Sequence, residues 1–406
     1  MMLNSRSVYL PALAASMVDK KDILHKNGKS FKFYRENGQF YYPKFLCSAG
    51  TNLAKTNFSK DLSIDLSKTL FLGDSGGYQL VTGVLKHSTE LVDKILNWLE
   101  ENTNYAMNID YPPFACDREE YERRLNITVD NFKYFKENAK NKTKLMGVLH
   151  GPDFERMKTW YERIKDFQFD GGWGMGSIRG GNIFYYLLNF FFLKEKGEFE
   201  RLAGKKALIH FLGFSRVKDM PVLLYLQHKL NKEDKDITVT FDSSYPFITA
   251  TYGHYFLNCT GLGFKIMTIS SKIVSLKESI NLDVQLPCNC PICKNVSFKD
   301  ILANHYDDES KEKSIFYLYL GVHNLYRLLE NKYNCENIIF TECRSLYDSA
   351  FTTKTNSLIN IIDQAFEQEH PAEFIQKNQN VISALDEPDE DLTLTKTKLS
   401  SFFGEE

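Results

Sequence analysis

The sequence alternates short apolar runs with longer amphipathic stretches, and this alternation constrains the fold more than any other feature. Eight runs have the length and composition of buried strands: 41–47, 69–73, 105–109, 144–149, 169–176, 207–213, 237–241 and 264–269. Between several of them, apolar positions recur at helical spacing, in residues 91–101, 118–139, 154–166 and 217–230. Strands that alternate with helices indicate a parallel sheet with crossover connections. We therefore predict an α/β fold, a (β/α)8 TIM-like barrel, with an open doubly wound sheet as the alternative.

Polar or small residues end most of these runs in a repeated position. The residues concerned are Asp74, Asp110, His150, Gly176, Gly213 and Asp242. A single aspartate after a strand is usually the cap of the next helix. Carboxyl ends of barrel strands, however, converge on one face, where active sites are built. We therefore expect the three carboxylates to meet in one pocket.

Three of the eight cysteines lie within six residues, in the segment CNCPIC. Cys288, Cys290 and Cys293 can hold one tetrahedral zinc if a fourth ligand comes from elsewhere. His323, on an expected helix, is the preferred fourth ligand, and His305 is the rival. Without a metal, the cluster would be a group of buried free thiols. No open coordination position is evident, so we predict one structural zinc.

Length, composition and charge limit the size of the fold, the partners and the cellular compartment that we expect for the chain. The 406 residues suit a barrel with additions, and the net charge of −2 gives no overall basic field. No apolar run is long enough to span a bilayer, and we expect no membrane association. The segment SVYLPALAASMV resembles a signal peptide, but the metal-type cysteine pattern indicates a reducing compartment, and we predict a cytoplasmic protein.

These observations suggest three parts. We assign residues 1–285 to the first part of the catalytic barrel and residues 286–345 to a zinc-binding subdomain with the last barrel helix. Residues 346–406 form a C-terminal extension that ends in an acidic, flexible tail.

Three motifs together resemble those of the tRNA-guanine transglycosylase superfamily: DSGGYQ at 74–79, FDSSYP at 241–246, and CxCxxC followed by a histidine in HN. The resemblance runs from about residue 40 to residue 330. It implies a (β/α)8 barrel with a zinc subdomain, and an enzyme that exchanges a guanine in a polynucleotide for a 7-deazaguanine. It also implies that Cys288, Cys290, Cys293 and His323 are the zinc ligands.

The resemblance assigns roles position by position. Asp74 is similar to the general acid/base, and Asp242 is similar to the nucleophile that forms a covalent glycosyl intermediate. Asp110 matches the aspartate that reads the guanine edge. The other implied base-binding residues are Ser75, Gly76, Tyr78, Gln79, His150, Gly176 and Ser177. Of these, Tyr78 would stack on the purine, and His150 replaces a glutamine that is usual in the family.

Departures from the family favour DNA over tRNA as the substrate. The segment after Asp242, SSYPFITATYGHYF, lacks the Lys and Arg residues with which the bacterial tRNA enzymes grip tRNA. We also expect no added C-terminal RNA-binding domain like that of the archaeal members. These departures resemble the DNA-guanine transglycosylases, which insert 7-cyano-7-deazaguanine (preQ0), and accessory modification proteins are possible partners. The C-terminal KLSSFF is similar to a sliding-clamp-binding peptide, although docking of this tail on its own barrel is the simpler interpretation.

Three rival functions stay open. The chain could be a tRNA-guanine transglycosylase. It could be a non-catalytic subunit of such an enzyme, although Asp74 and Asp242 are both present. A carbohydrate-active barrel with paired carboxylates is the third, and the cysteine motif argues against it.

Overall fold

The computed structural model describes residues 6–13, 17–176, 182–257, 263–269, 282–302 and 312–386. The chain forms two compact units, each assembled from separate segments. The first unit comprises residues 1–12, 43–243 and 352–387, and the second comprises residues 13–42, 244–351 and 388–406. Residues 13–42 and 244–285, which the sequence analysis placed with the barrel, thus belong to the second unit.

The first unit contains an eight-stranded parallel sheet with the order β1-β8-β7-β6-β5-β4-β3-β2. Its strands are β1 (Val8–Pro11), β2 (Lys44–Ser48), β3 (Leu70–Asp74), β4 (Tyr105–Met107), β5 (Lys144–Leu149), β6 (Gly172–Met175), β7 (Ala207–Phe211) and β8 (Ile237–Ser243). A parallel bridge between Ala12 and Leu46 joins the two edge strands. The sheet thereby closes into a TIM-like barrel, which confirms the predicted fold class.

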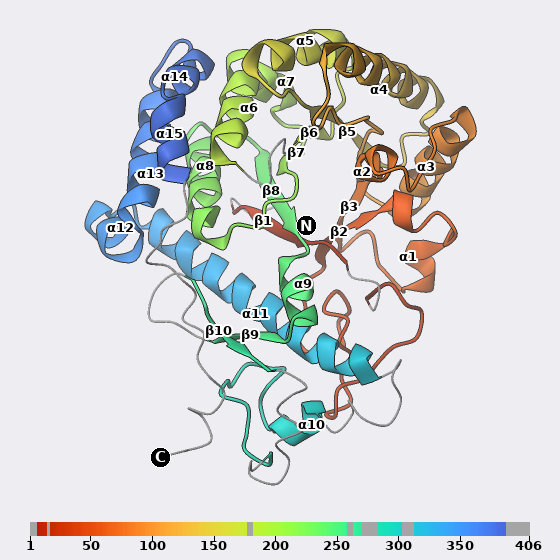
Figure 1. Cartoon of the computed structure of the whole chain (residues 1–406), viewed down its shortest axis with the longest axis vertical. Helices are drawn as coiled ribbons and strands as arrows, with labels where there is room; N and C mark the ends of the chain where they lie inside the picture. The colour runs from red at the N-terminus through yellow and green to blue at the C-terminus, as the bar shows by residue number, and fades with distance from the viewer. Residues whose placement is uncertain are drawn as a thin grey trace. The chain divides into compact units, whose positions relative to one another are not determined.

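Helices surround this sheet (Figure 1). They are α1 (Phe58–Asp61), α2 (Gly77–Val81), α3 (Thr89–Asn102), α4 (Arg118–Asn138), α5 (Phe154–Ile164), α6 (Ile183–Glu195), α7 (Glu198–Leu202) and α8 (Met220–Lys232). Four of these helices begin at a side chain that accepts a hydrogen bond from a first-turn amide: Ser88, Asp117, Asp153 and Asn182. Such caps satisfy amides that lack a partner within the helix, and they fix where each helix starts after its strand.

Helix α6 is apolar on all sides because it is covered on all sides. Its sequence, IFYYLLNFFFLKE, has ten buried residues. Helices α14 (Pro371–Lys377) and α15 (Gln379–Asp386) pack on it, and α13 (Thr353–Phe366) packs on α8. Phe366 of α13 contacts the rings of Phe190 and Phe191. The C-terminal helices therefore complete the outer layer of the barrel unit, as an all-round apolar helix requires.

One strand prediction was wrong. Residues 264–269 contain β10 (Lys265–Thr268), which pairs antiparallel with β9 (His254–Leu257) in the second unit and not with the barrel. The eighth barrel strand is β1, which lies within the segment that resembles a signal peptide. Tyr9 and Leu10 of β1 are fully buried, and β1 pairs with β8 over four residues.

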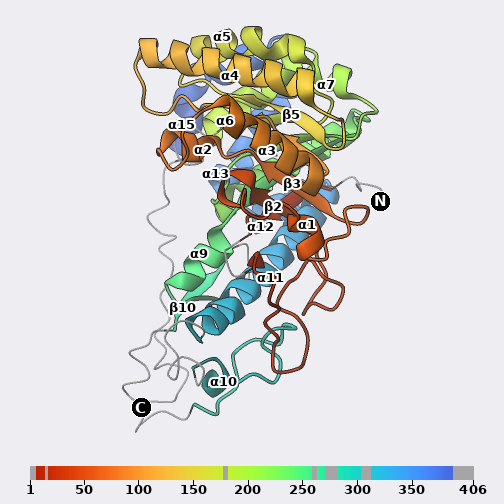
Figure 2. The ribbon, with the colours of Figure 1, turned by 90° about the vertical axis from the view of Figure 1, so that its right-hand side faces the viewer.

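The second unit is organised around one long helix, α11 (Glu312–Phe340). Helix α9 (Tyr245–Thr251) and strand β9 pack on α11, and Figure 2 shows α9 and α11 side by side. Gly321 permits this close approach, because a Cβ there would lie 2.7 Å from Cδ1 of Phe247. The remaining helices are α10 (Phe298–Leu302) and α12 (Arg344–Ala350).

Some predictions concern residues outside the described ranges. These are Ser177, His305 and the tail that carries KLSSFF. Within the described ranges, no helix combines the length and the apolar character that crossing a bilayer demands.

Candidate active site and metal centre

The carboxyl ends of the barrel strands carry the predicted site residues. Asp74 is the last residue of β3, and Asp242 is the penultimate residue of β8. Asp110 lies three residues beyond the end of β4, while His150 and Gly176 directly follow β5 and β6. Because all eight strands are parallel, these positions share one face of the barrel.

A cavity of about 450 Å³ opens at this face, within the size range of small-molecule sites. The described residues that line it are Leu46, Asp74, Gly77, Tyr78, Asp110, Pro112, Phe114, His150, Gly176, Leu212, Gly213 and Asp242. All of them belong to the first unit. The three carboxylates predicted to meet in one pocket therefore do so.

Asp74 is a carboxyl group of this cavity with a raised pKa. Burial raises the pKa of Asp74 from 3.8 to about 6. The Ser48 hydroxyl and the Gly76 amide oppose this increase in pKa, whereas the charges of Asp110 and Asp242 add to it. A carboxyl group with a pKa near 6 can both donate and accept a proton close to neutral pH.

Asp110 and His150 form a buried pair. Nε2 of His150 lies 2.6 Å from Oδ2 of Asp110, and the histidine side chain is 2% exposed. An ionised carboxylate only accepts hydrogen bonds, so the imidazole donates here. Nδ1 of His150 has no hydrogen-bond partner among the described residues. This nitrogen is itself buried and lies beside Gly176, so the imidazole is enclosed by the protein and acts on the cavity through Asp110.

Gly176 is required by His150. A Cβ at position 176 would lie 2.0 Å from both Cε1 and Nδ1 of the His150 ring. Any larger residue would displace the ring from its place beside Asp110. The glycine therefore provides clearance for a side chain of the site, a role that the sequence motif alone did not indicate.

Two hydrogen-bond donors hold Asp242, and the sequence did not predict that they act on the same carboxylate. Its Oδ1 accepts a hydrogen bond from the Gly213 amide at 2.7 Å and lies 3.2 Å from Nε2 of His210. His210 is fully buried in β7. The available signal was a lone histidine in the apolar run ALIHFLG, three residues before the strand-end glycine.

The remaining residues of the DSGGYQ segment have different positions. Tyr78 lines the cavity and is 63% exposed, so its ring is available for stacking. Ser75 is buried and donates its hydroxyl hydrogen bond to the Asn108 carbonyl at 3.1 Å. Gly76, at φ 98°, donates its amide to Oδ1 of Asp74 at 3.3 Å, a conformation that favours glycine. Gln79 does not line the cavity. Ser75 and Gly76 do not line the cavity, and their hydrogen bonds stabilise the backbone next to Asp74.

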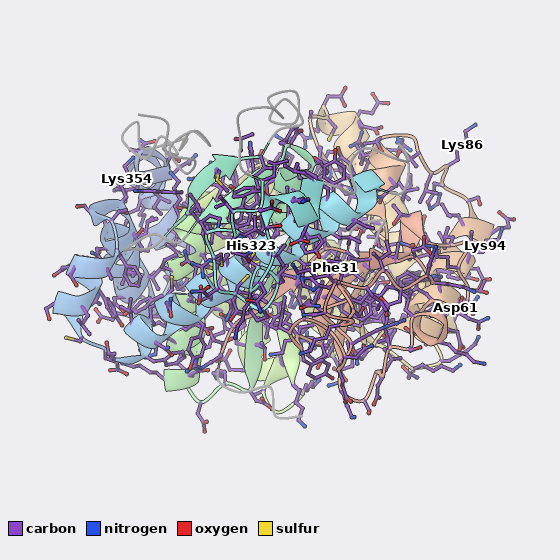
Figure 3. All side chains as sticks on the ribbon, turned by 90° about the horizontal axis from the view of Figure 1, so that it is seen from below. Phe31, Asp61, Lys86, Lys94, His323 and Lys354 are labelled. Carbon is purple, nitrogen blue, oxygen red and sulfur yellow. The ribbon has the colours of Figure 1, made fainter. Side chains whose placement is uncertain are left out.

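The second unit contains the predicted metal cluster. Cys288, Cys290, Cys293 and His323 each offer one ligand atom, and these atoms lie within 4.8 Å of one another. Nδ1 of His323, which Figure 3 labels, lies 3.4 Å from Sγ of Cys290 and 3.2 Å from Sγ of Cys293. The cluster could hold a metal ion through three thiolates and one imidazole.

Neighbouring residues fix the orientation of the histidine. Its Nε2 lies 2.9 Å from the Phe256 carbonyl, so Nδ1 is left for a metal. The Tyr255 ring stacks on the imidazole at 3.9 Å between centroids, and its hydroxyl donates to Sγ of Cys293 at 3.1 Å. Asn324 accepts from the Phe256 amide at 3.0 Å, which ties the β9 backbone to α11. This explains why a histidine and an asparagine occur together in the HN motif.

The barrel cavity thus combines a carboxyl group with a raised pKa, a carboxylate anchored through one oxygen, a carboxylate–imidazole pair and an exposed aromatic ring. Such a set can transfer protons, form a covalent bond to an electrophilic carbon and bind a planar heterocycle. A comparison of the sequence with protein-family models and with curated proteins finds no match, so a function must be inferred from the chemistry of these residues.

Proposed function

We propose that the chain is a guanine transglycosylase that replaces a guanine base in DNA with a 7-deazaguanine of the preQ0 type. The observation that carries this proposal is the pair of unlike carboxyl groups in one cavity. Asp74 has a pKa raised to about 6, whereas Asp242 is an acceptor for two hydrogen bonds on one oxygen. A carboxyl group with a raised pKa suits proton transfer, and a carboxylate that is held in place by hydrogen bonds suits nucleophilic attack.

The proposed reaction has two displacements at the sugar. In the first, Asp242 attacks the anomeric carbon while the bond to guanine breaks, and protonated Asp74 gives its proton to the departing purine. In the second, the incoming 7-deazaguanine loses a proton to Asp74 and attacks the same carbon, and the Asp242 carboxylate leaves. Two inversions retain the sugar configuration.

Base recognition in this proposal uses the other side of the cavity. A stacked ring on Tyr78 contributes roughly 1–3 kcal/mol per base, which offsets part of the cost of extruding a base from a duplex. Asp110 accepts from N–H groups of the base. His150 holds Asp110 in place for this contact through its Nε2, which lies 2.6 Å from Oδ2 of Asp110.

The metal in the second unit is, we propose, one structural zinc. The separations of 3.2 and 3.4 Å between the His323 nitrogen and two sulfurs are close to the edges of a tetrahedron with Zn–S of about 2.3 Å and Zn–N of about 2.0 Å. The three sulfurs lie within 4.8 Å of one another, so three thiolates here would repel one another without a cation between them. The four protein ligands complete the coordination, which is the pattern of a structural site. The unpaired cysteines of the described chain also fit a reducing compartment such as the cytoplasm.

DNA is favoured over tRNA because residues 243–256 contain no Lys or Arg. The alternative is a tRNA-guanine transglycosylase. The two substrates are distinguished by incubating metal-loaded protein with labelled guanine and either duplex DNA, single-stranded DNA or tRNA. We expect label in DNA and none in tRNA. Label in tRNA alone would show that the enzyme catalyses the same exchange reaction with tRNA as its substrate.

The nucleophile is tested with Asp242→Asn, which preserves shape and removes the charge. The wild-type chain should form a protein–DNA adduct that survives denaturation, and the variant should form none while it still binds 7-deazaguanine. Asp65→Asn, at an exposed position outside the cavity, is the matched control and should behave as wild type. An active Asp242→Asn variant would contradict the two-displacement reaction.

A further inference from the structure

His210 occupies an unusual place in the barrel. It is fully buried in β7, and both of its ring nitrogens have partners on the neighbouring strand β8. Nδ1 lies 2.9 Å from Oγ1 of Thr240, and Nε2 lies 3.2 Å from Oδ1 of Asp242. A buried imidazole with two specific partners is held in one orientation.

The partners also fix which nitrogen carries the proton. An ionised Asp242 only accepts, so Nε2 of His210 must carry a hydrogen to interact favourably with it. The Thr240 hydroxyl can then donate to Nδ1, and Thr240 is itself fully buried. A neutral imidazole with its proton on Nε2 thereby satisfies all three groups.

The two oxygens of Asp242 are consequently unlike. Oδ1 receives the Gly213 amide at 2.7 Å and the His210 imidazole at 3.2 Å. Oδ2 has no hydrogen-bond partner in the part of the chain that the structure describes. Since the side chain lines the cavity and is 11% exposed, Oδ2 is the oxygen left to meet a substrate.

We propose that His210, oriented by Thr240, is a positioning residue that anchors Oδ1 of Asp242 so that Oδ2 attacks the sugar. This inference rests on the proposed transglycosylase function and specifies how its nucleophile works. In the first displacement, a bond forms between Oδ2 and the anomeric carbon as the bond to guanine breaks. In the second, the deprotonated 7-deazaguanine forms a bond to the same carbon as the bond to Oδ2 breaks, and the electron pair of the broken bond returns to the Asp242 carboxylate.

The anchoring has an unequal effect on the two steps. Hydrogen bonds to a carboxylate are stronger than those to the ester that it becomes, because the ionised acceptor carries full charge. The donors at Oδ1 therefore stabilise the carboxylate as it leaves in the second displacement. Loss of the His210 donor should slow breakdown of the covalent adduct roughly 10- to 100-fold, the range typical for a hydrogen bond to a charged group.

The test measures adduct formation and adduct breakdown separately in single-turnover reactions with DNA. His210→Leu and Thr240→Val should slow breakdown and accumulate adduct, whereas Thr240→Ser, which retains the hydroxyl, should restore the wild-type ratio of the two rates. His228→Leu, at another buried histidine of the same unit, should leave that ratio unchanged. A merely structural role would lower active protein without changing the ratio.

Imidazole ¹⁵N spectra provide a readout that needs no activity. We expect His210 to carry its proton on Nε2 in the wild type and to lose this fixed tautomer in Thr240→Val, a nearly isosteric change that spares the fold. Unchanged breakdown rates in His210→Leu and Thr240→Val would overturn the inference, and so would a wild-type proton fixed on Nδ1 alone. Absence of any adduct with folded wild type would overturn the proposed function and this inference together.

Discussion

Replacing Asp74 by asparagine should stabilise the folded chain at neutral pH while it removes the proton donor of the site. Burial raises the pKa of Asp74 from 3.8 to about 6, so the folded state binds this proton more tightly than the unfolded state. Wild-type stability therefore falls as the pH rises from about 4 to about 6 and is level above that range. A pKa shift of about 2 units corresponds to a loss of about 3 kcal/mol in the free energy of unfolding of the wild type. The asparagine variant avoids this loss because it has no charge to bury.

Urea unfolding of the metal-loaded proteins measures the free energy of unfolding. Between pH 4.5 and 7.5, the wild type should lose about 2 kcal/mol of it through ionisation of Asp74. The free energy of unfolding of Asp74→Asn, minus that of wild type, should increase by that amount across the range. Asp65→Asn is the control, because hydrogen bonds from Ser67 lower the pKa of Asp65 and its neutralisation should bring no gain with rising pH. A difference between Asp74→Asn and wild type that is constant with pH would refute the assignment of a raised pKa to Asp74.

Three further predictions concern the same two sites. If departure of guanine limits exchange, the rate should fall about tenfold per pH unit above pH 6, as protonated Asp74 is lost; a flat profile from pH 6 to 8 would exclude Asp74 as the acid. Gly176→Ala should weaken 7-deazaguanine binding at least tenfold by calorimetry, because the new Cβ would lie 2.0 Å from the His150 ring; unchanged affinity would exclude His150 from base binding. Cys290→Ser should reduce bound zinc from one per chain to none by elemental analysis and lower the melting temperature, since a structural metal contributes directly to folding; full retention of metal would show that this thiol is not a ligand.

Seven of the eight barrel strands could be predicted from the sequence, because buried parallel strands are short apolar runs between helices. The prediction assigned the run that contains β10 to the barrel and omitted β1, and this error has a physical cause. Strand β1 is only four residues long and is followed by ALAAS, so its local pattern matches a secretory segment. Strand β10 is equally apolar, and an isolated run does not reveal its partner or the direction of pairing. Both errors concern long-range pairing.

The candidate site was more predictable than the architecture around it. Strand-end positions were enough to bring Asp74, Asp110 and Asp242 to one cavity, because parallel strands place their carboxyl ends on a common face. The contacts of His210 were not predictable, since a lone histidine in an apolar strand is most often a satisfied core residue. Its role depends on a neighbour 32 positions away in the sequence. This contact depends on the register between β7 and β8, and local sequence patterns carry no information about register.

The position of β1 in the barrel has a consequence for synthesis of the chain. Val8 pairs with Thr240, so β1 leaves the ribosome more than 200 residues before its partner strand β8. At translation rates of about 5–20 residues per second, this interval lasts roughly 10–50 seconds. During this interval, the Ala12–Leu46 bridge to β2 is a contact with the nascent sheet that β1 can already form. Barrel closure is therefore a late event during biosynthesis, and the apolar residues of β1 lack their β8 partner until that strand emerges.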